Sequence, residues 1–94
     1  MLSVTQAEAD FTASVAIYMA GFNAGRRSET QDTEAAAARF SARHPEATEI
    51  DRALFYIAFD EAICEEPRAT ADDIYYKVMG LEESRARWAA AQAI

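Results

Sequence analysis

The sequence predicts an all-α fold, and three features of its composition and pattern support this. Alanine, the residue with the highest helix propensity, supplies 22 of the 94 residues. Only three glycines and two prolines are available for turns. No stretch alternates apolar and polar residues over more than a few positions, as a half-buried strand would. We therefore expect one domain, residues 1–94, built as a small bundle of four to five helices.

The first expected helix, Thr5 to Gly25, carries two apolar faces. At about 100° per residue, the large apolar side chains lie on one face and the alanines lie on the opposite face. The first face holds Phe11, Val15, Tyr18 and Phe22, and the second holds Ala9, Ala13, Ala16, Ala20 and Ala24. Other helices can pack against such a helix from both sides.

The alanine face of this helix has two interpretations. In one, the aromatic face packs on the core and the alanines stay exposed to water at little cost. In the other, the alanines and the Gly21-x-x-x-Gly25 spacing beside them admit a second helix at close range, such as the same helix of another copy. This second interpretation predicts a homodimer with a self-association surface made of Ala9, Ala13, Ala16, Ala20, Gly21 and Ala24.

Capping residues predict where the second and third helices begin. Thr33 is placed to cap a helix that runs through Ala42. Thr48 and Asp51 have the spacing of a capping box and open a third helix that extends to about Cys64. We expect the third helix to be central, because it again has two apolar faces. One face holds Ile50, Leu54, Ile57 and Ala58, and the other holds Phe55, Phe59 and Ile63.

The same capping spacing recurs near the C-terminal end of the chain. Thr70 and Asp73 open a short fourth helix that is expected to end near Gly80, and Glu82 to Ala93 form a fifth. The segment Thr70 to Ala90 therefore also fits a helix-turn-helix, with its turn at Gly80. The acidic start of its second helix would oppose docking on phosphates, and a plain helical hairpin explains the same residues.

Charge is concentrated in one part of the chain. The formal net charge is −7, and the segment from Glu46 to Asp73 carries all of it. Its negative potential repels nucleic acid and attracts basic surfaces. One interpretation is a solvated face that keeps a small protein soluble. The other is mimicry of a phosphate backbone, in which a basic protein surface is bound by Asp60, Glu61, Glu65, Glu66, Asp72 and Asp73.

Catalytic, metal and cofactor sites are not predicted. The chain has one histidine, His44, and one cysteine, Cys64, so a zinc site built from such ligands is excluded within one chain. His44 precedes a proline at an expected helix end, and Cys64 ends an apolar helix and is expected in the core. We expect no enzymatic activity, no metal and no cofactor.

The compartment is predicted from what the sequence lacks. Its longest stretch without a charge, Phe11 to Gly25, has 15 residues, whereas a membrane span needs about 20. A lone cysteine forms no intrachain disulfide, and no basic segment precedes an apolar run as in a secretory signal. We expect a cytoplasmic protein with no membrane association.

One segment resembles a known group of proteins. Residues Met19 to Arg26 read Met-Ala-Gly-Phe-Asn-Ala-Gly-Arg, which resembles the helix-end pattern Ala-Gly-aromatic-x-Ala-Gly-Arg of short phage-encoded proteins. The resemblance covers eight residues and transfers no functional residue. It implies a phage or prophage origin, where small acidic helical proteins inhibit host defence systems, CRISPR complexes among them.

These observations predict a non-enzymatic interaction protein. It would act in the host cytoplasm as a small acidic inhibitor that binds and blocks a nucleic-acid-handling complex, as an anti-CRISPR protein does. Two alternatives remain open. One is a DNA-binding regulator that uses the helix-turn-helix of Thr70 to Ala90, and the other is a structural or assembly protein whose chief property is self-association.

Overall fold

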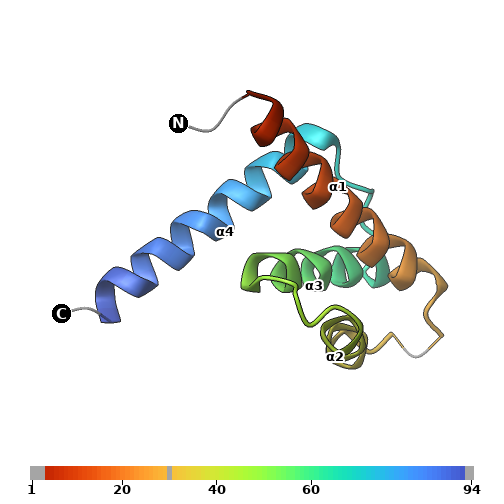
Figure 1. Ribbon diagram of the computed structural model, residues 1–94. Helices are drawn as coiled ribbons and strands as arrows, with labels where there is room; N and C mark the ends of the chain where they lie inside the picture. The colour runs from red at the N-terminus through yellow and green to blue at the C-terminus, as the bar shows by residue number, and fades with distance from the viewer. Residues whose placement is uncertain (1–3, 30, 93–94) are drawn as a thin grey trace.

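The computed structural model describes residues 4–29 and 31–92 and forms four helices and no strand within these ranges. This confirms the all-α prediction. Figure 1 shows α1, α2 and α3 gathered together, while one end of α4 projects away from them. Side chains are described from Thr12 onward, so Ala9 and Phe11 lie outside the described side chains. The helices are α1 (Val4–Arg27), α2 (Thr33–Arg43), α3 (Glu49–Ile63) and α4 (Ala71–Gln92).

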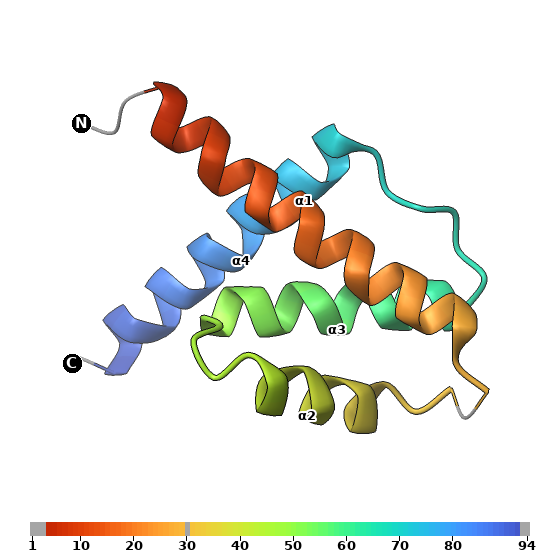
Figure 2. The same ribbon diagram turned by 45° about the vertical axis from the view of Figure 1, so that its right-hand side comes forward.

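Helix α3 packs against each of the other three helices, as its two apolar faces predict. Figure 2 shows it between α1 and α2. One face joins a cluster with α1 and α4, and the other face joins a cluster with α2. The first cluster contains Tyr18, Phe22, Leu54, Ala58, Ala62 and Ile74, and the second contains Ala36, Phe55 and Phe59. Phe40 of α2 stacks on Phe55 with ring centroids 4.3 Å apart.

Helix α1 approaches α3 closely at two glycines, one turn apart. A Cβ atom added at Gly21 would lie 2.7 Å from the carbonyl oxygen of Phe55, and one added at Gly25 would lie 2.7 Å from that of Phe59. The glycine spacing therefore does admit a second helix, but that helix is α3 of the same chain. The prediction that Gly21 belongs to a self-association surface is wrong, because α3 buries it.

The alanines of α1 are largely outside this contact. Ala13, Ala16 and Ala20 are exposed, and Ala24 is half-buried against the cluster that contains Phe59. Both interpretations of the alanine face agree with exposure in a single chain. Self-association through these alanines therefore stays a prediction.

The caps of α2 and α3 confirm one prediction and correct another. Thr48 and Asp51 form the reciprocal capping box of α3. Helix α2, by contrast, is capped by Asp32, whose side chain accepts a hydrogen bond from the Ala35 N–H at 3.0 Å. Thr33 is not the cap because its side chain is buried and its hydroxyl donates to Asp60 at 3.4 Å.

Helix α4 runs without a break through Gly80, so the predicted fourth and fifth helices are one. A glycine inside a helix costs only about 1 kcal/mol relative to alanine, and no proline or new cap follows Gly80 to end the helix. The reciprocal hydrogen bonds of Thr70 and Asp73 do cap its start, as predicted. The segment Thr70 to Ala90 therefore lacks the turn that a helix-turn-helix requires.

The C-terminal half of α4 extends beyond the other helices (Figures 1 and 2). Every residue from 82 to 92 is exposed, and Trp88 exposes 68% of its surface. Arg85 forms an ion pair with α3, its Nε atom lying 3.8 Å from a carboxylate oxygen of Glu49. Among the described helices, none combines the length and apolar character that crossing a lipid bilayer would need.

Candidate functional site: the acidic junction of α3 and α4

The six carboxylates predicted to bind a partner lie in residues 60–73, which we call the acidic junction. Asp60 and Glu61 lie in the last turn of α3, Glu65 and Glu66 follow its end, and Asp72 and Asp73 lie in the first turn of α4. All are exposed except Glu61. The structure thus places these residues on one connected segment, but it gives them different partners.

Glu61 holds the fold together and is not available to a protein partner. Its side chain is only 14% exposed, and one carboxylate oxygen lies 2.9 Å from the ammonium nitrogen of Lys77. The other oxygen accepts a hydrogen bond of 2.9 Å from the hydroxyl of Tyr18. That hydroxyl in turn accepts a bond of 3.1 Å from the Ala69 N–H. The prediction of Glu61 as a partner-binding residue is corrected, because its charge is already paired inside the chain.

This arrangement also changes the acidity of Tyr18. The side chain is fully buried, and burial raises the pKa of its hydroxyl to about 12. The hydrogen bond from Ala69 works in the opposite direction, while the negative charge of Glu61 raises the pKa further. Tyr18 therefore stays neutral at any physiological pH and keeps donating to Glu61.

Two further carboxylates of the junction also have partners within the chain. Asp60 accepts the hydrogen bond from Thr33, and Asp73 accepts one of 3.3 Å from the Thr70 N–H. Within the described residues, no side-chain hydrogen bond or ion pair is made by the three other carboxylates, Glu65, Glu66 and Asp72. These three are the members of the predicted set that remain free to meet a partner.

Helix α3 ends in a Schellman motif that contains Glu65 and Glu66. The N–H of Glu65 donates to Ala62, and the N–H of Glu66 donates to Glu61. This motif places Glu65 at a φ of 61°, in the left-handed region that glycine adopts without steric cost. A carboxylate side chain therefore stands at a position where helices usually place glycine.

We expect Glu65→Gly to stabilise the fold by about 1 kcal/mol, because glycine removes the steric cost of the left-handed conformation. Urea unfolding measures the change. Glu65→Gln separates the effect of charge from that of conformation, and Glu66→Gly is the matched control outside the left-handed position. A gain for Glu65→Gln equal to that of Glu65→Gly would assign the effect to charge instead.

Glu65 and Glu66 also lie at the electrostatically unfavourable end of α3. The carbonyl groups at a helix C-terminus carry partial negative charge, so this position favours cations. The last turn of α3 contains no basic residue. Asp72 and Asp73, by contrast, lie at the N-terminus of α4, where negative charge is favourable. The carboxylates that follow α3 are thus the ones that a basic partner would stabilise most.

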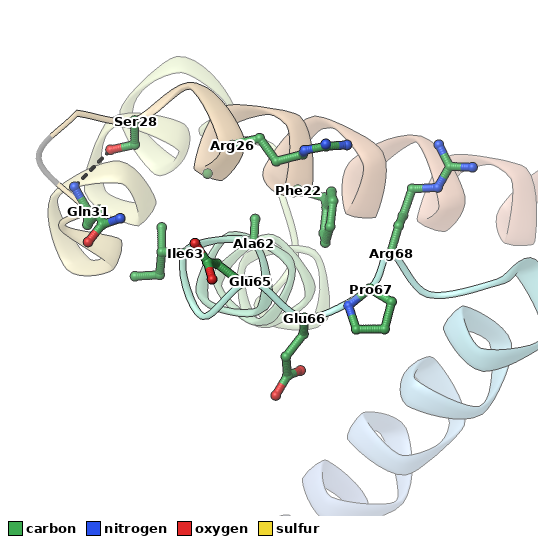
Figure 3. A pocket seen from close by; sticks show the side chains of 11 residues that line it. Phe22, Arg26, Ser28, Gln31, Ala62, Ile63, Glu65, Glu66, Pro67 and Arg68 are labelled. Atoms are coloured by element: carbon green, nitrogen blue, oxygen red, sulfur yellow. Dashed lines mark hydrogen bonds between the residues drawn. The ribbon is translucent and has the colours of Figure 1, made fainter.

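The segment that links α3 to α4 separates two surface hollows. Figure 3 shows the first, of about 440 Å³, with Phe22, Arg26 and Ala62 around it. The second, of about 480 Å³, is lined by Asp73, Tyr76 and Lys77 among others. Glu66, Pro67 and Arg68 line both hollows. Of the three free carboxylates, Glu65 and Glu66 therefore lie beside concave surface that can receive the side chains of a partner.

The described residues offer little to catalysis. No three histidine, cysteine, aspartate or glutamate side chains among them gather as a metal ion would require. Cys64 is exposed at the end of α3, so the prediction that it packs in the core is wrong. At 100° per residue, position 64 lies on the side of α3 that carries the exposed Tyr56 and Asp60, away from the buried Ala58 and Ala62. The absence of an enzyme function stays a prediction.

Sequence reasoning missed Tyr76 as a member of this site. Tyr76 exposes 68% of its surface and lines the second hollow beside Asp73. The sequence does indicate that Tyr76 is exposed, since at 100° per residue it lies well away from the face that carries Ile74 and Leu81.

No protein-family model, curated protein or solved structure matches this chain.

Proposed function

We propose that this protein is a non-enzymatic interaction protein that binds a basic surface of a macromolecular partner through the acidic junction. One observation carries the proposal: at the negative end of α3, the carboxylates of Glu65 and Glu66 have no ion-pair partner among the residues that the structure describes. Glu65 also occupies a backbone conformation that favours glycine. Residues whose charge or backbone conformation is unfavourable at their position, and which make no contact that compensates for it, are typical of functional sites.

The proposed partner belongs to a nucleic-acid-handling complex. A groove that binds phosphates is lined by lysine and arginine, and unpaired carboxylates next to an exposed aromatic side chain complement such a groove. Glu65 and Glu66 supply the charge in this proposal, and Tyr76 supplies the aromatic contact. By occupying the groove the protein would exclude nucleic acid, as the resemblance of Met19 to Arg26 to phage-encoded proteins implies for an anti-CRISPR-like inhibitor.

Reversing the charge of Glu65 and Glu66 tests this proposal. We expect Glu65→Lys/Glu66→Lys to lose a partner that the wild-type protein captures from nuclease-treated bacterial lysate at low salt. The control Glu29→Lys/Glu34→Lys makes the same change in net charge at exposed positions outside the junction and should keep the partner. Mass spectrometry identifies what is captured. Capture that is equal for both variants contradicts the proposed role of the junction.

A further inference from the structure

A basic groove lies between α1 and α2, in a protein with a net charge of −7. It has a volume of about 480 Å³, and its floor is formed by Phe40, Phe55 and Phe59. Ala20 and Ala24 of the alanine face form part of its α1 wall. We call this surface the α1/α2 groove. A smaller hollow of about 280 Å³ shares Ala20, Phe40 and His44 with it and extends it along α1. This extension is lined by the carboxylates Glu46 and Asp51, so the basic part of the surface is the groove itself.

Three arginines line the α1/α2 groove. Arg27 comes from the end of α1, and Arg39 and Arg43 lie one turn apart on α2. All three are exposed, and in the described part of the chain no carboxylate forms an ion pair with any of them. An aromatic floor with unpaired arginines at its edges suits an amphipathic helix whose polar residues are acidic.

Helix α4 of the same protein presents a surface of this kind. At 100° per residue, Asp72, Tyr75, Met79, Glu83 and Ala86 fall within one narrow arc of the helix. All five are exposed, with Tyr75 at 47% and Met79 at 41%. We call this set the α4 ridge. It combines apolar side chains with the carboxylates of Asp72 and Glu83, of which Glu83 also forms an exposed ion pair of 3.3 Å with Arg87 on the same helix. The groove combines an apolar floor with three guanidinium groups.

We propose that the α4 ridge of one copy docks in the α1/α2 groove of a second copy. The residues that line the groove come from α1, α2, α3 and the positions directly after α1 and α2, and none of the described lining residues comes from α4 of the same chain. Docking of one groove on its own equivalent would bring six arginines together, which opposes a symmetric contact over Ala20 and Ala24. A contact between two different surfaces leaves one groove and one ridge free at the ends, so it continues into a ring or an open chain.

Paired charge reversals test this head-to-tail contact. The groove variant is Arg39→Glu/Arg43→Glu and the ridge variant is Asp72→Lys/Glu83→Lys, and all four positions are exposed. Light scattering coupled to size exclusion is expected to show wild-type masses that rise with concentration above the 10.4 kDa of one chain and fall with added salt. Each variant alone should remain at the mass of one chain. Their equimolar mixture should assemble again, because every groove then meets a ridge of opposite charge.

The controls make each outcome decisive. The Glu29→Lys/Glu34→Lys variant changes the net charge as much as the ridge variant does, and it should assemble like the wild type. Far-ultraviolet circular dichroism checks that all variants are folded. If Arg39→Glu/Arg43→Glu is unfolded, Arg39→Ala/Arg43→Ala is used as the groove variant in its place. A monomeric wild type at every concentration overturns the proposal, and so does a mixture that stays monomeric. Self-association of the groove variant alone would indicate a symmetric dimer over the alanine face and would also overturn it.

Discussion

Replacing Gly21 and Gly25 together with alanine is expected to lower the free energy of unfolding by about 2–6 kcal/mol, a large part of the total for a small domain. Each new Cβ atom would lie 2.7 Å from a backbone carbonyl oxygen of α3, and backbone cannot rotate away as a side chain can. Overpacking costs about 1–3 kcal/mol at one position, and a small domain is stable by only about 5–15 kcal/mol in total. The separation of α1 from α3 would have to increase, which would open the core around Tyr18.

Gly80→Ala is the matched control for this experiment. Gly80 lies inside α4, and an added Cβ atom would meet nothing within 4 Å. The same substitution should therefore raise the free energy of unfolding by about 1 kcal/mol through helix propensity alone. Urea unfolding followed by circular dichroism measures all variants. Equal effects at the three glycines would show that α1 and α3 do not pack as closely as the structure has them.

Stability is expected to fall by about 2–3 kcal/mol between pH 10 and pH 12, because Tyr18 holds its proton more tightly in the folded chain than in the unfolded one. Its pKa is raised from 10.0 to about 12 on folding. Below pH 10 both states are protonated and the stabilisation by the buried hydroxyl is complete. Above pH 10 the unfolded state loses the proton first, so the stabilisation is lost as the pH approaches 12, at 1.36 kcal/mol per pKa unit.

Tyr18→Phe separates this effect from the titration of every other group in this pH range. At pH 8 the variant should be less stable by about 1–3 kcal/mol, since the Ala69 N–H and a carboxylate oxygen of Glu61 lose their partner. As the pH approaches 12 the difference between variant and wild type should shrink. The exposed Tyr56 provides the control, because Tyr56→Phe should leave the pH dependence unchanged. A constant difference between wild type and Tyr18→Phe from pH 8 to pH 12 would refute the role of Tyr18.

The start of a helix could be predicted from the sequence where residues close together in the chain determine its cap. The capping box of Thr48 and Asp51 needs only residues three positions apart, and it forms as the spacing predicts. The cap of α2 depends on more than local spacing. Asp32 and Thr33 are both good caps, and what distinguishes them is that Thr33 turns inward toward Asp60, 27 positions away. A contact at that separation is not visible in a local pattern.

The residue or helix that each group contacts was harder to predict than the surface on which the group lies. The Gly21 and Gly25 spacing correctly indicated a close helix contact, but not that α3 supplies it. The acidic segment likewise did not reveal that Glu61 is already paired with Lys77, because Lys77 belongs to another helix. The arginines of the α1/α2 groove come from two helices and converge only once both helices pack on α3. In each case the missing information is tertiary.

The exposed position of Trp88 has a practical consequence for fluorescence. It is the single tryptophan of the chain and stands on the part of α4 that projects from the body. Its indole ring is hydrated whether the core is intact or melted, so its emission will change little on denaturation. Any marked blue shift in the native protein would instead report that another molecule has covered the projecting end of α4, without a label being attached.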